Sequence, residues 1–315
     1  MQLIDDFIAD MDLSPGTCKL YKKTLHYWVN WSVEHQREFR DVVPADLVTY
    51  KRHLKDKGVS ASTIDSYLTS VRKFCRWLVG MEYIAKNPAE QLGWTRDRHG
   101  TFIKQSLSIE QVFKLMEVHK INSAVSKRNF ALIDLMAFTG LRCIEVTRLN
   151  IGDIKNVSGR WILQVWRKGH NEKSGIIVVP EDRIKTIKEY WNYRPGDLND
   201  NQPVFVNHSP RSSGTRLTPV CISRIIKATL RKIGLNSNKY TAHSLRHTAA
   251  TLAYKAGSEN WEIQLLLGHA NPRQTEHYLR ALGIQSVDQG RATEKINDYA
   301  LKQRIHNKKP IKSKE

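Results

Sequence analysis

The segment 240–280 reads YTAHSLRHTAATLAYKAGSENWEIQLLLGHANPRQTEHYLR and carries the most distinctive chemistry of the chain. His243 and Arg246 stand three residues apart, so on a helix they share one face. His269 follows a glycine, which is typical of a helix end, and Tyr278 comes nine residues later. Basic side chains that bind phosphate are thus followed by an aromatic hydroxyl that can act as a nucleophile. This arrangement is typical of a site that attacks a phosphodiester without a metal.

Length and charge limit what the protein can be. A chain of 315 residues predicts two domains, each large enough to bury a core. The 50 Lys and Arg residues exceed the 31 Asp and Glu residues, which gives a net charge of +19. So large an excess favours a polyanionic partner, most simply nucleic acid. The alternative is a basic protein without a particular partner.

The cysteines and the N-terminus predict where the protein acts. The 4 cysteines are scattered without a C-x-x-C pair, so we expect reduced thiols and neither disulfides nor a zinc site. The N-terminal segment MQLIDDFIADMD is acidic and amphipathic, unlike a secretory signal, and no apolar run approaches membrane-spanning length. We expect a soluble cytoplasmic protein that associates with the nucleoid.

Four short motifs occur along the chain, namely T-G-L-R-x-x-E at residues 139–145, H-x-L-R-H at 243–247, L-G-H at 267–269 and T-x-x-Y at 275–278. They resemble the motifs of the tyrosine recombinase (phage integrase) family, including its Xer-like members. Each is weak alone, but together they occur in the order of the family and are highly specific. The resemblance covers nearly the whole chain and is strongest at residues 106–280.

The resemblance implies a mainly α-helical fold with a small antiparallel β-sheet. Residues 1–92 would form a four-helix core-binding domain of the SAM-like type, followed by a linker at 93–105. Residues 106–285 would form the catalytic domain, and 286–315 a segment with a basic tail that includes a candidate helix for docking on a neighbouring protomer. Because the helical domain begins at residue 1, we expect no arm-binding domain of the kind found in larger phage integrases.

Sequence periodicity agrees with this architecture. Apolar residues at helical spacing predict four helices before residue 90, with Ser14 capping the second and Ser62 the fourth. Runs of branched or alternating apolar residues predict three strands, at 151–157, 160–166 and 175–179. Before these strands, a near-continuous apolar helix at 130–138 leads into the first arginine motif.

The chemistry of the motifs assigns a role to each residue. In-line attack on a phosphodiester places negative charge on the non-bridging oxygens, which the forked guanidiniums of Arg142 and Arg246 would bind. Tyr278 would be the nucleophile, and its phosphotyrosine keeps the bond energy for rejoining without ATP. His243 would be the general base toward the tyrosine and the acid on its return, and His269 would donate a hydrogen bond to the phosphate.

Three further residues are assigned less directly. The family has a G-K-G hairpin lysine that would protonate the leaving 5′ oxygen, and Lys168 matches it although Arg167 replaces the first glycine. Lys173 is the alternative, and a turn lysine is otherwise a solvated surface residue. One interpretation of Glu145 is a purely structural pair with Arg142. Both roles are compatible, since Glu145 can brace this region while Arg142 points at a phosphate.

His247, the last residue of its motif, is interpreted as structural. Because it packs just past an arginine, we expect a supporting role.

Basic residues on the first helices are candidates for DNA contacts. The candidates for phosphate contact are Lys19, Lys22, Lys23, Lys51, Arg52, Arg72, Lys73 and Arg76. The alternative for these eight is an ordinary solvated surface.

The resemblance implies a site-specific DNA recombinase of the integrase or resolvase type, such as those of mobile elements. It would act as a homotetramer on two double-stranded DNA sites, through 3′-phosphotyrosine intermediates and a Holliday junction, and would be monomeric or weakly associated when free. No cofactor is implied, and the sequence has no cluster of carboxylates that suggests a metal site. Two alternatives stay open: a type IB topoisomerase with the same chemistry, and a DNA-binding protein that lacks catalysis.

Overall fold

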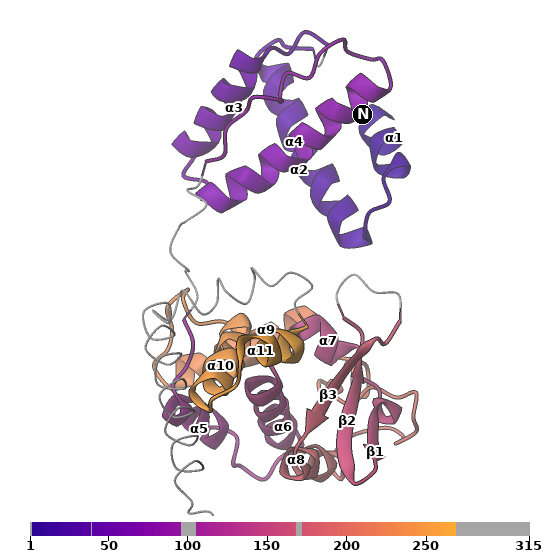
Figure 1. Ribbon diagram of the computed structural model, residues 1–315, viewed down its shortest axis with the longest axis vertical. Helices are drawn as coiled ribbons and strands as arrows, with labels where there is room; N and C mark the ends of the chain where they lie inside the picture. The colour runs from indigo at the N-terminus through magenta and orange to yellow at the C-terminus, as the bar shows by residue number, and fades with distance from the viewer. Residues whose placement is uncertain (1, 39, 96–104, 168–171, 269–315) are drawn as a thin grey trace, which may run out of the picture. The chain divides into compact units, whose positions relative to one another are not determined.

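The computed structural model describes residues 2–38, 40–95, 105–167 and 172–268 (Figure 1). The chain divides into two compact units, Met1–Gly100 and Thr101–Glu315. None of the helices in these described parts is both long and apolar enough to cross a membrane. The predicted C-terminal segment, 286–315, lies outside the described residues.

The first unit is helical. It contains α1 (Gln2–Asp10), α2 (Pro15–Glu34), α3 (Pro44–Asp56) and α4 (Ala61–Gly80). Ser14 caps α2 as predicted, since its hydroxyl accepts from a backbone N–H of the first turn. The cap of α4 is Ser60, whose Oγ lies 3.3 Å from the Thr63 backbone N. The prediction of Ser62 as this cap is wrong, because the helix begins one residue before it and Ser62 lies within its first turn.

Aromatic side chains build the core of this unit. The rings of Phe7 and Phe74 meet edge to face with centroids 5.3 Å apart, and Trp28 contacts Phe74 in the same way at 6.1 Å. All three side chains are buried. Burial of such side chains contributes about 1.5–3 kcal/mol each relative to exposure. These contacts join α1, α2 and α4 into one bundle.

The second unit combines helices with a sheet. Its described elements are α5 (Ile109–Glu117), α6 (Ala124–Thr139), α7 (Cys143–Thr147), the 3-10 turn η1 (Ile151–Asp153), β1 (Ile154–Val157), β2 (Arg160–Val165), β3 (Gly175–Val179), α8 (Glu181–Trp191), α9 (Pro219–Lys232), α10 (Ala242–Lys255) and α11 (Asn260–Leu267). The strands form an antiparallel sheet in the order β1-β2-β3. The predicted strands are confirmed, except that 151–153 is a 3-10 turn.

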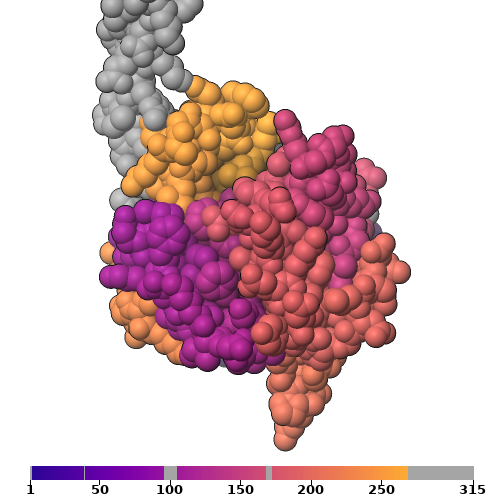
Figure 2. Space-filling model, turned by 90° about the horizontal axis from the view of Figure 1, so that it is seen from below, coloured from indigo at the N-terminus to yellow at the C-terminus, as the bar shows by residue number. Residues whose placement is uncertain are grey.

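The helix α6 lies in the middle of this unit and the sheet at one edge (Figure 1). It packs against both α8 and α10, and all the apolar side chains from Ala131 to Ala137 are buried, as its continuous apolar sequence predicts. On β3 the side chains alternate, with Ile177 and Val179 buried and Ile176 and Val178 exposed. Figure 2 shows segments coloured for residues 105–140, 150–215 and 240–268 adjoining on one face of this unit.

Acidification is expected to weaken the second unit through His119. This buried side chain places Nε2 2.8 Å from Oγ1 of Thr229 on α9. Burial, together with the nearby charges of Lys232 and Arg128, lowers the pKa of His119 from its usual 6.5 to about 4. Between pH 6.5 and 4, the unfolded chain therefore protonates His119, whereas the folded state keeps it neutral. This contribution to stability is present above pH 6.5 and is lost as the pH falls toward 4, by up to about 1.4 kcal/mol per pH unit.

The His119→Gln variant measures this contribution, since glutamine retains a hydrogen-bonding group and does not titrate. Its free energy of unfolding in urea should fall less steeply than that of the wild type between pH 6.5 and 4. Equal slopes would show that the histidine does not cause the pH dependence.

Candidate active site

The first arginine motif begins where α6 ends. Gly140 terminates the helix with a φ of +65°, in the left-handed region that favours glycine. A Cβ at this position would lie 2.7 Å from Cδ2 of Leu267 and 3.2 Å from Cβ of Ala249. Only glycine therefore lets α6 end against α10 and α11. This close approach brings the first arginine motif next to the H-x-L-R-H motif on α10 and next to Leu267 and Gly268 of the L-G-H motif.

Arg142 is the N-cap residue of α7 and is held there by Glu145. The backbone N of Arg142 donates to Oε2 of Glu145 at 2.9 Å, and its guanidinium Nη1 donates to Oε1 at 2.7 Å. The Glu145 side chain is fully buried, whereas that of Arg142 is 23% exposed. The pair thus fixes the guanidinium from one side and leaves the side chain accessible to a ligand. The predicted pair of Arg142 and Glu145 exists, and it does not preclude phosphate binding.

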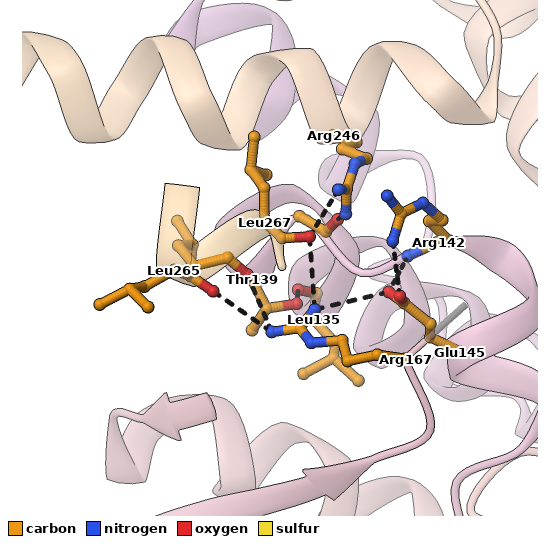
Figure 3. Close-up of polar contacts among 10 residues, drawn as sticks. Leu135, Thr139, Arg142, Glu145, Arg167, Arg246, Leu265 and Leu267 are labelled. Carbon is orange, nitrogen blue, oxygen red and sulfur yellow. Dashed lines mark hydrogen bonds and ion pairs between the residues drawn. The ribbon is translucent and has the colours of Figure 1, made fainter. Parts of the chain in front are cut away.

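Arg246 lies on α10 and is almost completely buried. It donates from Nη1 to the carbonyl oxygen of Gly140 at 2.7 Å and from Nη2 to that of Leu267 at 2.5 Å. These carbonyls belong to the ends of α6 and α11, where the last carbonyls lack partners within the helix. A guanidinium stabilises such helix ends. Figure 3 shows Arg246 and Arg142 near each other, from elements distant in the sequence.

A third arginine completes this cluster. Arg167 follows β2, is buried, and donates from Nη2 to the carbonyl oxygens of Leu265 and Leu266 at 3.4 and 3.2 Å. Its Nη1 lies 3.8 Å from Oε2 of Glu145. Burial lowers the pKa of Arg167, and Glu145 opposes this shift. The sequence prediction treated this residue only as a departure from the G-K-G pattern, so its place in the cluster was missed.

Removal of the buried carboxylate is expected to destabilise the second unit. Glu145 lies 2.7 Å from a nitrogen of Arg142 and 3.8 Å from one of Arg167. The Glu145→Gln substitution leaves both cations without this counter-charge, at an expected loss of about 3 kcal/mol in the free energy of unfolding. Urea unfolding measures the loss. Glu117→Gln is the matched control, because the Glu117–Lys120 pair is exposed and such pairs contribute less than about 1 kcal/mol. Equal losses in the two variants would contradict this role of Glu145.

The two histidines of the second motif differ in exposure. His243 is exposed in the first turn of α10, and His247 is buried one turn later. Their rings meet edge to face with centroids 5.0 Å apart. The exposed ring can reach a substrate, whereas the buried one packs behind it. These positions agree with a general base at His243 and a supporting role for His247.

Three predicted catalytic residues, Lys168, His269 and Tyr278, lie outside the described residues. The alternative hairpin lysine, Lys173, has its Nζ 2.5 Å from Oδ1 of Asp153, whose side chain is 5% exposed. An ammonium held by a buried carboxylate reaches a leaving group only after this pair breaks. This contact favours Lys168 as the general acid.

The basic residues predicted to contact DNA lie on α2, α3 and α4, and two of them donate to backbone carbonyls. Lys51 donates to the carbonyl oxygens of Gly93 and Trp94 at 2.8 and 3.1 Å. Arg72 donates to that of Leu92 at 2.5 Å, and its guanidinium lies 4.3 Å from the ring centroid of Trp94. These contacts attach the start of the predicted linker, 93–105, to the first unit.

The other six differ in their surroundings. Lys22 pairs with Asp5 at 2.5 Å, and Lys73 lies 5.8 Å from the ring centroid of Tyr21. The remaining four are exposed, namely Lys19, Lys23, Arg52 and Arg76. Exposed cations on helices are suited to phosphate contacts. We keep these four as the strongest candidates.

Across the described ranges, no group of three or more His, Cys, Asp and Glu side chains gathers as a metal site.

Residues 105–283 match the model of the Phage integrase family, and residues 2–81 match that of the phage integrase N-terminal SAM-like domain. The chain belongs to the phage integrase family. The predicted family and fold class are therefore confirmed, with a helical first unit and a three-stranded antiparallel sheet in the second.

This integrase-family chain is similar to bacterial recombinases over nearly its whole length. The tyrosine recombinase XerC of Herpetosiphon aurantiacus is 27% identical over 304 residues, which cover 93% of this chain and 95% of that protein. The tyrosine recombinase XerD of Oceanobacillus iheyensis is 28% identical over 286 residues, which cover 87% and 92%.

Solved structures share the fold of this integrase-family chain. The XerH site-specific recombinase, bound to palindromic difH substrate in a post-cleavage complex, has a TM-score of 0.72 at 21% identity, covering 88% of this chain and 79% of that one. A lambda integrase tetramer bound to a Holliday junction gives 0.68 at 15% identity, with coverage of 88% and 76%. At these identities the likeness concerns the fold alone.

Proposed function

We propose that this protein, as a tyrosine-type member of the phage integrase family, cuts and rejoins DNA at specific sites. The observation that carries the proposal is the pair of guanidiniums at Arg142 and Arg246. One is fixed by the buried Glu145, the other by carbonyls at the ends of two helices, and the two arginines come from motifs about 100 residues apart. Arg246 donates to Gly140, two residues before Arg142, and two guanidiniums fixed in the same part of the structure suit the non-bridging oxygens of one phosphodiester.

The reaction follows from the chemistry of the motif residues. The hydroxyl oxygen of Tyr278 attacks the phosphorus, with His243 as the base that accepts its proton. The bond to the 5′ oxygen breaks, and the leaving oxygen takes a proton from Lys168. His269 and the two arginines stabilise the charge on the non-bridging oxygens. A 3′-phosphotyrosine remains, and attack by another 5′ hydroxyl reverses these steps and joins a new strand.

Strand exchange requires several copies of the protein. We place two double-stranded sites in a homotetramer, with a Holliday junction as the intermediate. Residues 1–92 serve as the core-binding domain and 106–285 as the catalytic domain, joined by the linker at 93–105. In this arrangement the candidate helix within the segment 286–315 docks on the neighbouring protomer. A lambda integrase of the same fold is a tetramer on a Holliday junction, which supports the proposed tetramer and its junction intermediate.

A pool of nicked duplexes with randomised sequence tests the function whatever the target sequence is. Cleavage next to the nick releases a short strand, so the protein stays covalently attached to its DNA. The expected result is a denaturant-stable adduct whose DNA converges on one sequence with inverted repeats. Adducts without any sequence preference, together with relaxation of an arbitrary plasmid, would instead indicate a type IB topoisomerase. Binding without an adduct would indicate a DNA-binding protein that lacks catalysis.

Binding to the recovered site is expected to weaken steeply as salt increases. The net charge of +19 displaces counterions from the DNA backbone. If roughly six to ten phosphates are contacted, affinity falls by a factor on the order of 10³–10⁵ between 50 and 200 mM salt. Fluorescence anisotropy across this range measures the slope. A flat response would mean that the basic excess does not contact the DNA backbone.

A further inference from the structure

Arg167 has partners that a solvated turn residue does not need. It lies two residues beyond β2 and is 7% exposed. Its guanidinium donates to the carbonyl oxygens of Leu265 and Leu266, and a third contact joins Nη1 to that of Leu267 at 3.5 Å. The carbonyl end of α11 carries a partial negative charge, so a cation there is favourable. Arg167 therefore ties the end of β2 to the end of α11.

The surrounding backbone leaves room for this side chain. A Cβ at Gly268 would lie 2.5 Å from Nε of Arg167, and a Cβ at Gly175 would lie 2.6 Å from the same atom. Gly268 also has a φ of +60°, which ends α11. The guanidinium is thus enclosed by two glycines from β3 and from the end of α11. Such close enclosure restricts the arginine to one position.

Two contacts connect Arg167 with Arg142 and Arg246. The carbonyl oxygen of Leu267 accepts from both Arg167 and Arg246, at 3.5 and 2.5 Å. The carboxylate of Glu145 lies between Arg167 and Arg142, at 3.8 and 2.7 Å (Figure 3). Arg167 therefore shares one partner with each of the other two arginines.

We infer that Arg167 is a positioning residue that holds the guanidiniums of Arg142 and Arg246 in the orientation needed to bind the phosphate. This inference rests on the proposed function. Without Arg167, Glu145 has one cation instead of two beside it and draws Arg142 inward. The carbonyls at the end of α11 also lose a donor, which loosens the acceptor of Arg246. Both changes misplace donors that act in the transition state.

The test measures cleavage by Arg167→Met, which keeps the length of the side chain and removes its charge. On a nicked substrate at saturating protein, we expect cleavage about a hundredfold slower than in the wild type. Arg148→Met is the matched control, since this exposed arginine at the end of α7 lies over the ring of Trp166, with 5.9 Å to its centroid. It removes the same charge from the same region, and its rate should stay within about twofold of the wild type.

Combined variants separate positioning from general packing. In an Arg142→Ala or an Arg246→Ala background, one of the two contacts through which Arg167 acts is already lost, so adding Arg167→Met should slow cleavage by about tenfold instead of a hundredfold. A second readout uses a substrate with sulfur at the 5′ bridging position, whose thiolate leaves without a proton. This substrate should not restore the rate of Arg167→Met. Restoration would overturn the inference, because the arginine would then act through the general acid.

Other outcomes also decide the question. A full hundredfold loss in the wild-type and both variant backgrounds, or no loss in any of them, would overturn the inference. If Arg167→Met unfolds, Arg167→Lys replaces it in the same cycle, since a single ammonium cannot reach Glu145 and the α11 carbonyls together. If the wild type forms no adduct, the proposed function fails. The cycle is then measured as affinity for duplex DNA, where the same non-additivity supports the inference and strict additivity overturns it.

Discussion

The Tyr278→Phe variant is expected to form no denaturant-stable adduct on a nicked suicide substrate and to bind the same DNA nearly as tightly as the wild type. The substitution removes one oxygen, which is the proposed nucleophile, and leaves the basic surface unchanged. Loss of a nucleophile typically slows a reaction by a factor on the order of 10⁶, which places any remaining cleavage below detection. Denaturing gels measure the adduct, and anisotropy measures the affinity.

A second tyrosine in the same motif segment provides the control. Tyr240→Phe removes a hydroxyl just before α10 and should leave adduct formation unchanged. If Tyr278→Phe still forms the adduct, another residue is the nucleophile. If Tyr278→Phe loses DNA binding as well, the tyrosine contributes to the fold or the interface, and the loss of the adduct no longer assigns the nucleophile to it.

Local sequence signals predict the elements of the fold because those signals act over a few residues. The serine and proline at the start of α2 are recognisable without any tertiary contact. The alternation of β3 likewise follows from one buried face. The error at the cap of α4 arose because local signals did not decide between two candidate residues. Ser60 and Ser62 are both good caps by composition, and the choice between them depends on where the helix packs.

The sequence predicted those contacts of the site whose two side chains lie a few residues apart in one motif. The bond between Arg142 and Glu145 spans three residues, so the sequence suggested it. The role of Arg167 depends on backbone carbonyls about 100 residues away and on space left by Gly175 and Gly268. Every residue has a carbonyl, and a glycine does not reveal which side chain occupies the space beside it. No pattern in one sequence encodes that combination.

The basic residues on the helices of the first unit likewise could not be assigned to partners from the sequence alone. Composition predicts that Lys51 and Arg72 contact DNA as readily as their neighbours do. In the structure both donate to backbone carbonyls of residues 92–94. A carbonyl and a phosphate oxygen are both acceptors, so charge alone cannot distinguish a linker anchor from a DNA contact. Only the path of the chain after α4 separates the two.

The Lys168→Ala variant is expected to slow cleavage of an ordinary phosphodiester by roughly 10²–10⁴-fold, the usual range for loss of a general acid. If Lys168 protonates the leaving 5′ oxygen, its loss leaves a poor leaving group. A substrate with sulfur at the 5′ bridging position should restore most of the rate, because a thiolate departs without a proton. Arg142 and Arg246 act on the non-bridging oxygens, so sulfur at the bridging position should not restore the cleavage rate of Arg142→Ala or Arg246→Ala.

Lys173→Ala is the control for this prediction within the same hairpin. Its ammonium lies 2.5 Å from the carboxylate of Asp153, so we expect its loss to affect stability more than the leaving-group step. Restoration by sulfur in Lys173→Ala and not in Lys168→Ala would assign the general acid to the opposite side of the hairpin. Restoration in neither variant would place the acid outside this turn. The arginine at position 167 would then mark a true departure from the G-K-G pattern, with the buried cation retained for positioning and the lysine beside it released from catalysis.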